Sequence, residues 1–259
     1  MQGDNGFGTI LELVRDLRRR CDFDRALTLD TLRPYLREEI AEFEDALDAG
    51  REDKIASELG DLLLHCAFQL VLAEERRAFD LAQVAERLVT KMKRRHPHLY
   101  DERGEKRDER SEAKPNWEKQ KLEERRREAA AHGEPPSVLG HISNRLPELE
   151  RAFRYQERAA AVGFDWPDVA GPLEKLDEEV REARVHPRDE IGDVLFAAVN
   201  VARKAGMHPA IALRHATLKF VRRFGAVEQL AGARGVELGA APLDALDRLW
   251  DEVKAAEHG

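Results

Sequence analysis

The chain has 259 residues, of which 42% are hydrophobic and 36% are charged, and its formal net charge is −8. Its length allows one large domain or two small ones, and 17 glycines with 11 prolines are too few for a collagen-like or low-complexity protein. A net acidic chain is a poor prior for a nucleic-acid coat or a polybasic membrane anchor. We therefore expect neither nucleic acid nor membrane among its partners.

The N-terminal segment and the cysteines predict a cytoplasmic protein. The first 20 residues lack the basic region and apolar run of a secretory signal. No stretch reaches 18 uninterrupted apolar residues, so we expect no transmembrane helix. The only cysteines, Cys21 and Cys66, form no CxxC pair, and two reduced thiols are the simplest interpretation.

Helical periodicity runs through the first hundred residues. Apolar side chains recur at spacings of three and four between Leu36 and Leu47, a more apolar run covers 59–71, and a third helix is predicted over 81–92. This third helix should end before Pro97, because the residue before a proline is disfavoured in the α region. No segment alternates with period two, so the predicted fold class is all-α, with the helix over 59–71 at its centre.

A neutral mixture of ten basic and ten acidic residues fills 101–131, around Trp117. Because these charges cancel, an exposed helix or linker is favoured over a nucleic-acid arm. The segment HGEPPS at 132–137 is the clearest boundary in the chain. We predict a first repeat with its charged linker at 1–131 and a second repeat at 138–259.

The second half repeats the first. Four blocks recur in the same order: 37–47 at 177–185, 58–68 at 190–200, 91–95 at 219–223, and 116–124 at 249–257. The offset is 140 residues in the first block and 128 to 133 in the others. We interpret this as a tandem duplication of helical-bundle units, with an eight-residue deletion between the two acidic blocks of the second copy.

Each copy carries Glu-Glu-x-x-Glu on one predicted helix and Glu-x-x-Asp on the next. Residues three or four apart share a helix face, so two antiparallel helices can direct four carboxylates at one point. These would repel one another without a cation, and oxygen-only donors favour Mg²⁺ or Mn²⁺ over zinc. The predicted ligands are Glu39, Glu42, Glu58 and Asp61 in the first copy and Glu179, Glu182, Glu190 and Asp193 in the second.

A solvated acidic helix face is the competing interpretation, and for a single motif in so charged a chain it would be preferred. Its recurrence beside the most apolar helix of each copy favours the metal site, because acidic groups next to a core are costly unless they are paired. Gly60 and Gly192 precede the Asp of each copy. Glycine in a helix interior costs about 1 kcal/mol relative to alanine, so its recurrence suggests room for a neighbouring backbone or ligand.

Basic blocks supply a complement to the carboxylates. They are Lys219, Arg222 and Arg223 in the second copy and Lys91, Arg94 and Arg95 in the first. Facing metal-bound carboxylates, such cations would suit a polyphosphate. The first block could instead interact favourably with the negative C-terminal end of a helix that ends before Pro97. His96 and His98 are better explained by the turn around that proline than as metal ligands.

Together these segments resemble the MazG family of nucleoside triphosphate pyrophosphohydrolases in its two-repeat form, over nearly the whole chain. Both copies match its EExxE and ExxD signature, and further matches are 21–24, 91–100, 159–169, 219–224 and Trp250. The resemblance implies an all-α fold and a homodimer. It also implies cleavage of NTP or dNTP to NMP and pyrophosphate, dependent on Mg²⁺ or Mn²⁺, in control of the nucleotide pool.

The resemblance also implies roles for single residues. Metal ligands fall on the four carboxylates of the second copy, and nucleotide contacts fall on Lys175, Asn200, Lys219, Arg222, Arg223 and Trp250. Glu178 or Glu38 could deprotonate the attacking water. Asn200 is equally well explained as a satisfied polar residue within the bundle. Phe164 and Trp166 could stack on a base, although core packing is the default for such aromatics.

The second copy departs from the family in the length of its turn. Seven residues separate Glu182 from Glu190, where 15 separate Glu42 from Glu58. Removing about four residues, or one turn, from each arm would let the carboxylates converge across a tighter connection.

We nevertheless expect the second copy to carry most of the hydrolysis. It has Lys175 and Asn200 where the first copy has Tyr35 and Phe68, which offer a nucleotide fewer polar contacts. The competing hypothesis is a non-catalytic helical module that binds nucleotides or a partner protein.

Overall fold

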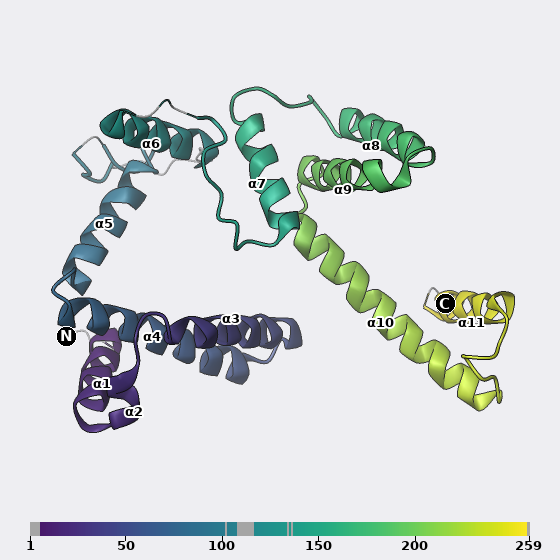
Figure 1. Cartoon of the computed structure of the whole chain (residues 1–259), viewed down its shortest axis with the longest axis horizontal. Helices are drawn as coiled ribbons and strands as arrows, with labels where there is room; N and C mark the ends of the chain where they lie inside the picture. Colours follow the sequence, from purple (N-terminus) through teal and green to yellow (C-terminus); the bar gives the residue numbers. More distant parts are fainter. Residues whose placement is uncertain (1–5, 102, 108–116, 134, 136, 258–259) are drawn as a thin grey trace. The chain divides into compact units, whose positions relative to one another are not determined.

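The computed structural model describes residues 6–101, 103–107, 117–133, 135 and 137–257 (Figure 1). Within these ranges the chain is helical and contains no strand, which confirms the all-α class. The nearest approach to a strand is an isolated bridge between Tyr100 and Lys106. The chain divides into two compact units, 1–115 and 116–259, which are described separately.

The first unit is built around one apolar helix. Its helices are α1 (Gly6–Arg20), α2 (Asp22–Ala26), α3 (Leu32–Ala49), α4 (Glu52–Glu75) and α5 (Leu81–Arg94). Helix α4 packs against both α1 and α3, and its buried Phe68 and Val71 form a core with Leu11 and Val14 of α1. The predicted central helix is therefore confirmed, and α5 ends three residues before Pro97, as the proline predicts.

Helix α4 is also long and apolar enough to cross a membrane, judged by length and composition alone, and among the described residues no other helix meets that test. The sequence did not predict this, because Glu58 and Asp61 interrupt the apolar residues of α4, and the expectation was based on uninterrupted apolar stretches. Its C-terminal half is buried against α1. This packing is that of the core helix of a globular unit.

In the second unit, the other helices pack mainly against α9 and α10. Its helices are α6 (Trp117–His132), α7 (Glu148–Ala160), α8 (Ala170–Ala183), α9 (Pro187–Lys204), α10 (Pro209–Ala233) and α11 (Leu243–Ala256). Helix α8 runs along α9, α7 contacts both α9 and α10, and α11 packs on α10 through Leu249, Val227 and Ala231. Helix α6, which the sequence assigned to the linker of the first repeat, contacts α7. The repeat boundaries themselves stay a prediction.

Candidate functional site

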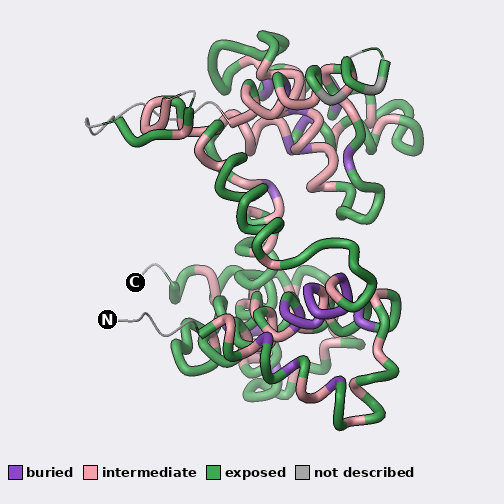
Figure 2. The backbone as a smooth tube through the Cα atoms, turned by 90° about the vertical axis from the view of Figure 1, so that its left-hand side faces the viewer, coloured by how far each residue is buried: buried purple, intermediate pink, exposed green. Residues whose placement is uncertain are grey.

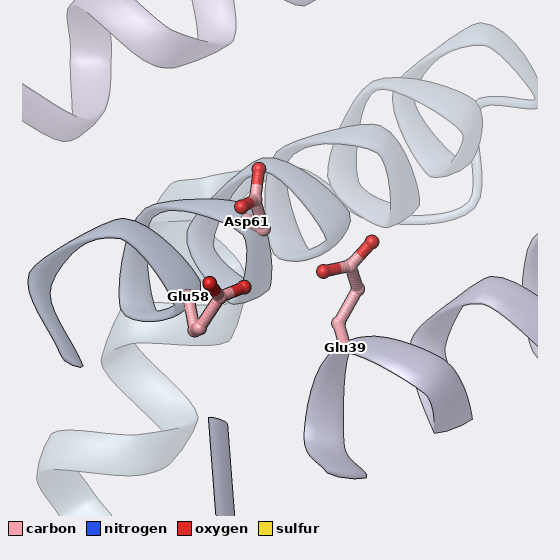
Figure 3. A group of neighbouring side chains, drawn as sticks. All are labelled: Glu39, Glu58 and Asp61. Carbon is pink, nitrogen blue, oxygen red and sulfur yellow. The ribbon is translucent and has the colours of Figure 1, made fainter. Parts of the chain in front are cut away.

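Three of the first copy's predicted ligands come together between α3 and α4. Gly50, in the left-handed region at φ 63°, and Arg51 connect the two helices and turn the chain back on itself. Glu39 of α3 faces Glu58 and Asp61 of α4, and one oxygen of each lies within 4.8 Å of the others (Figure 3). Glu42, one turn further along α3, is exposed and lies outside this group.

The carboxylates of this cluster lie close enough to repel one another. Partial burial raises the pKa of Glu39, and repulsion by Asp61, Glu42 and Glu58 raises it further. A cation placed among these oxygens would remove that repulsion. The donor set, all carboxylate oxygen, therefore fits a hard divalent ion.

A buried histidine adjoins the same cluster, and the sequence analysis missed it. His65 lies one turn after Asp61 on α4, and its Nε2 is 4.0 Å from Oε1 of Glu39. Desolvation lowers the pKa of His65, and its buried Nδ1 has no hydrogen-bond partner in the described part of the chain. The available signal was its spacing of i+4 from Asp61 and i+7 from Glu58, which places all three on one helix face.

The second copy brings together a different set of three. Glu179 and Glu182 of α8 and Glu190 of α9 each have an oxygen within 4.8 Å of the others, and Glu179 is buried. Asp193 is exposed and lies outside this group. Lys175 Nζ lies 2.8 Å from Glu179 Oε1 and 3.0 Å from Glu178 Oε1, and these contacts raise the pKa of Lys175.

The shortened turn takes residues unequally from the two helices. Helix α3 runs seven residues past Glu42, whereas α8 runs one past Glu182. Helix α4 has six residues before Glu58, whereas α9 has three before Glu190. The deletion thus removes six residues from one arm and three from the other, and the connection gains one, rather than losing about four from each arm. Three carboxylates converge in each copy nonetheless.

Open space adjoins both helical glycines. A Cβ built at Gly60 or at Gly192 would meet nothing within 4 Å among the described residues. No other segment of the described chain comes within that distance of either Cβ position. The open space expected at these positions is therefore present among the described residues.

The predicted contacts on α10 and α11 form a cluster of their own. Arg222 Nη2 lies 2.9 Å from Glu257 Oε1, and Arg223 Nε donates to Glu257 Oε2 at 2.8 Å. Trp250 packs against Phe220, with ring centroids 5.5 Å apart. Lys219 is exposed on α10. Among the described side chains, no recorded contact joins this cluster to the carboxylates of α8 and α9.

The remaining predicted polar and aromatic residues are Asn200, Phe164 and Trp166. Asn200 is half-buried and its Oδ1 accepts a hydrogen bond from Arg203 Nε at 2.8 Å, as a satisfied polar residue would. The default of core packing is wrong for Phe164, which is 81% exposed. It follows a turn at Gly163, whose φ is 89°. Trp166 covers Gly171, where a Cβ would collide with the indole ring.

The other predictions concern groups outside these clusters. Glu38 and Glu178, the proposed bases, are exposed on α3 and α8, each next to a clustered glutamate. The His96 Nδ1 lies 2.6 Å from the carbonyl oxygen of Met92, as expected of a histidine in the turn. Among the described residues, the groups able to hold a metal include neither His96 nor His98. Both cysteines are free, as predicted.

Comparison with known proteins gives a consistent result. A sequence model described as the MazG nucleotide pyrophosphohydrolase domain matches residues 27–100, which contain the first carboxylate set. The chain is 36% identical to the nucleoside triphosphate pyrophosphohydrolase of Escherichia coli K12, over 96% of both chains. It is also 36% identical to the nucleoside triphosphate pyrophosphohydrolase/pyrophosphatase MazG of Thermotoga maritima, over 97% of both.

Proposed function

The chain belongs to the MazG family of nucleotide pyrophosphohydrolases, and from that premise we propose that its paired carboxylates hold the cation with which it cleaves nucleoside triphosphates. The chain is a hydrolase of the nucleoside triphosphate pyrophosphohydrolase class. The metal, the active copy, the assembly and the compartment are the parts proposed here. The observation that supports the site is the convergence of three carboxylates in each copy within 4.8 Å.

Mg²⁺ is the proposed cation, with Mn²⁺ as its substitute. Carboxylate oxygens alone suit these ions. Desolvation, together with repulsion by Asp61 and the neighbouring glutamates, raises the pKa of Glu39, and a cation would relieve that repulsion. When bound, Mg²⁺ would offset the charge of the phosphate oxygens as the bond breaks. In the first copy, Glu39, Glu58 and Asp61 would hold it, with Glu42 as the predicted fourth ligand. In the second copy, Glu179, Glu182 and Glu190 would hold it, with Asp193 as the predicted fourth ligand.

The chain's own residues would carry the proton and position the phosphates. Glu178, or Glu38 in the first copy, accepts a proton from the attacking water. The water oxygen bonds to the α-phosphorus, the bond from that phosphorus to the bridging oxygen breaks, and pyrophosphate leaves. Lys175 lies beside the same carboxylates, where it pairs with Glu179. Once that pair is broken, its ammonium group would donate a hydrogen bond to a phosphate oxygen.

We propose that the second copy carries most of the hydrolysis. It has Lys175 and Asn200 at two positions where the first copy has Tyr35 and Phe68. In the first copy the position of Asn200 is taken by Phe68, which is buried in the hydrophobic core. The match of the family model to the first copy favours the opposite assignment. Inactivating each copy separately decides between them.

We propose that the working form is a homodimer. Large apolar side chains on α9 and α10 are exposed in the single chain, among them Leu195 at 60% and Val221 at 60%. Many residues of both units are exposed as well (Figure 2). Large apolar side chains that are exposed in a single chain support an interface with a second chain when they lie together. The free thiols of Cys21 and Cys66 suit the reducing cytoplasm, which is the proposed compartment.

The test is to incubate the protein with each nucleoside triphosphate and Mg²⁺ and to resolve the products by anion-exchange chromatography. We expect nucleoside monophosphate and pyrophosphate in equal amounts, and no turnover in EDTA. Nucleoside diphosphate and orthophosphate as main products would contradict the proposed attack at the α-phosphorus. Binding without turnover would favour the non-catalytic module.

A further inference from the structure

His65 is a buried imidazole beside the acidic cluster of the first copy. It is 7% exposed and lies on α4, four residues after Asp61 and seven after Glu58. Positions at these spacings share one face of a helix, and this is the face of α4 that meets Glu39 of α3. The first copy therefore places a nitrogen donor next to three carboxylates.

Neither nitrogen of His65 has a recorded hydrogen bond among the described residues. Its Nδ1 is buried without a partner. Its Nε2 lies 4.0 Å from Oε1 of Glu39, which is beyond the length of a hydrogen bond. Buried polar groups are nearly always paired, because an unpaired one loses its hydration without replacement. The partner of this imidazole is therefore a group from outside the described chain.

The separation of His65 from Glu39 suits a shared metal ion. Nitrogen and carboxylate ligands lie about 2.0–2.2 Å from a metal such as zinc, so two of them on one ion are at most about 4.4 Å apart. The 4.0 Å between Nε2 and Oε1 falls within that span. The group of three carboxylates within 4.8 Å does not include His65, so Glu39 is the carboxylate that would share an ion with it.

The second copy lacks this nitrogen at the equivalent position. Ala197 stands where the first copy has His65, and it is likewise 7% exposed. The cationic group beside Glu179 is Lys175, whose Nζ lies 2.8 Å away. An ammonium group has no lone pair for a metal, whereas a neutral imidazole does. The two copies therefore offer a cation different donors.

We propose that the first copy binds a divalent transition-metal ion, such as Co²⁺ or Zn²⁺, in preference to Mg²⁺, with His65 and Glu39 as ligands beside Glu58 and Asp61. Imidazole nitrogen suits these ions, whereas Mg²⁺ is held through oxygen. This inference rests on the carboxylate site proposed above. It assigns different metals to the two copies and leaves Mg²⁺ at the second.

The experiment uses Co²⁺ as the probe, with the full chain and no nucleotide. Proton NMR of the wild type with Co²⁺ should show a strongly shifted, exchangeable imidazole N–H resonance, because a histidine that binds through one nitrogen carries its proton on the other. In isothermal titration calorimetry, His65→Gln should weaken the tightest Co²⁺ site by at least about tenfold. The same variant should bind Mg²⁺ as the wild type does.

The matched control is His186→Gln. This histidine is exposed in the turn between α8 and α9, four residues from both Glu182 and Glu190. The control should keep the shifted resonance and the wild-type affinity for Co²⁺. Absence of the resonance from the wild type, or its loss in His186→Gln rather than in His65→Gln, would overturn the proposal. The wild-type spectrum decides the matter even where His65→Gln fails to fold.

The variant Glu58→Gln separates this proposal from the carboxylate site on which it rests. Weaker Co²⁺ binding in both Glu58→Gln and His65→Gln would support the mixed site. Weaker binding in Glu58→Gln alone would keep the carboxylate site and overturn the nitrogen ligand. Unchanged binding in both would overturn the first carboxylate site as well. A tight site in the wild type that prefers Mg²⁺ to Co²⁺ would also overturn the proposal.

Discussion

Lys175 pairs, within its own helix, with Glu179, a proposed metal ligand of the second site, and with Glu178, its proposed base. Its Nζ lies 2.8 Å from Glu179 and 3.0 Å from Glu178, so a divalent cation at Glu179 must displace it. Once displaced, the ammonium is close enough to contact a phosphate. The same residue should therefore oppose the metal and favour the nucleotide.

The variant Lys175→Met separates these two effects. Without nucleotide, Mn²⁺ should bind up to about fivefold more tightly, because an exposed ion pair of this kind contributes little more than that. The KM for nucleoside triphosphate should rise by about tenfold, since a charged contact to phosphate is lost. Electron paramagnetic resonance titration of Mn²⁺ and steady-state kinetics measure the two quantities.

A lysine outside the site provides the control for this variant. Lys121 forms a comparable pair with Glu118 on α6, at 2.6 Å, and Lys121→Met should change neither quantity. Weaker Mn²⁺ binding in Lys175→Met would show that the lysine supports the carboxylates rather than competing for them.

The equivalent glutamate of the first copy has a different neighbour. Glu39 faces the buried His65 of α4, at 4.0 Å, whereas the equivalent of His65 in the second copy is Ala197. A cation bound beside Glu39 therefore displaces no lysine. The two copies share an acidic motif but differ in the charge that surrounds it.

At the scale of elements, Glu257 joins α11 to α10. Its contacts with Arg223 and Arg222 lower its pKa to about 2, from an ordinary value near 4.5. A carboxyl with a lowered pKa in the folded state stabilises that state above the unfolded pKa and loses the contribution as the pH falls towards the folded pKa. This ion pair should therefore be fully formed at neutral pH and lost between about pH 4.5 and 2.

The variant Glu257→Gln tests this dependence. Its melting temperature should lie below that of the wild type at pH 7, and the difference should shrink as the pH falls below about 4.5. Thermal unfolding followed by circular dichroism across this range measures it. Glu237→Gln, at a position with no recorded ion pair in the described chain, is the control. A difference that grew on acidification would contradict the assignment.

The helices and the shared face of each acidic motif could be predicted because they depend on local rules, whereas Glu42 and Asp193 lie outside the three-residue groups that the packing of two helices brings together. The 3.6-residue repeat places Glu58 and Asp61 on one face, Gly50 and Arg51 return the chain, and Pro97 sets the end of α5. The composition of α4, with Phe68 and Val71, identified the central helix. Each of these depends on spacing within a short stretch of sequence.

The surroundings of the basic block could not be predicted in the same way. Periodicity shows that Arg222 and Arg223 lie near each other on α10, but their partner Glu257 is 35 and 34 residues away. Which helix covers a face depends on tertiary packing. The exposure of Phe164 was missed for the same reason, because aromatic composition predicts burial without showing which surface is available for it.

For the whole molecule, the exposed apolar side chains of α9 predict self-association. Leu195, 60% exposed, and Ile191, 53% exposed, lie one turn apart on the same face. Light scattering after size exclusion should give twice the chain mass of 29.5 kDa at micromolar concentration. Leu195→Glu should shift the population towards a single chain, because a charge in an apolar interface is strongly disfavoured.

The control for this substitution is Leu13→Glu, which places the same charge at an exposed leucine of α1. It should leave the mass unchanged. A single-chain mass for the wild type would contradict the homodimer directly.

The most direct test of the central proposal is pyrophosphate release by two matched variants, Glu190→Gln and Glu58→Gln. These glutamates occupy equivalent positions, and each belongs to the converged group of its copy. With saturating Mg²⁺ and nucleoside triphosphate, we predict that Glu190→Gln loses at least about a hundredfold in rate. Glu58→Gln should retain most of it, with both variants folded by circular dichroism. A wild-type rate in Glu190→Gln, with activity abolished in Glu58→Gln, would contradict the assignment to the second copy, and wild-type rates in both would contradict the carboxylate site itself.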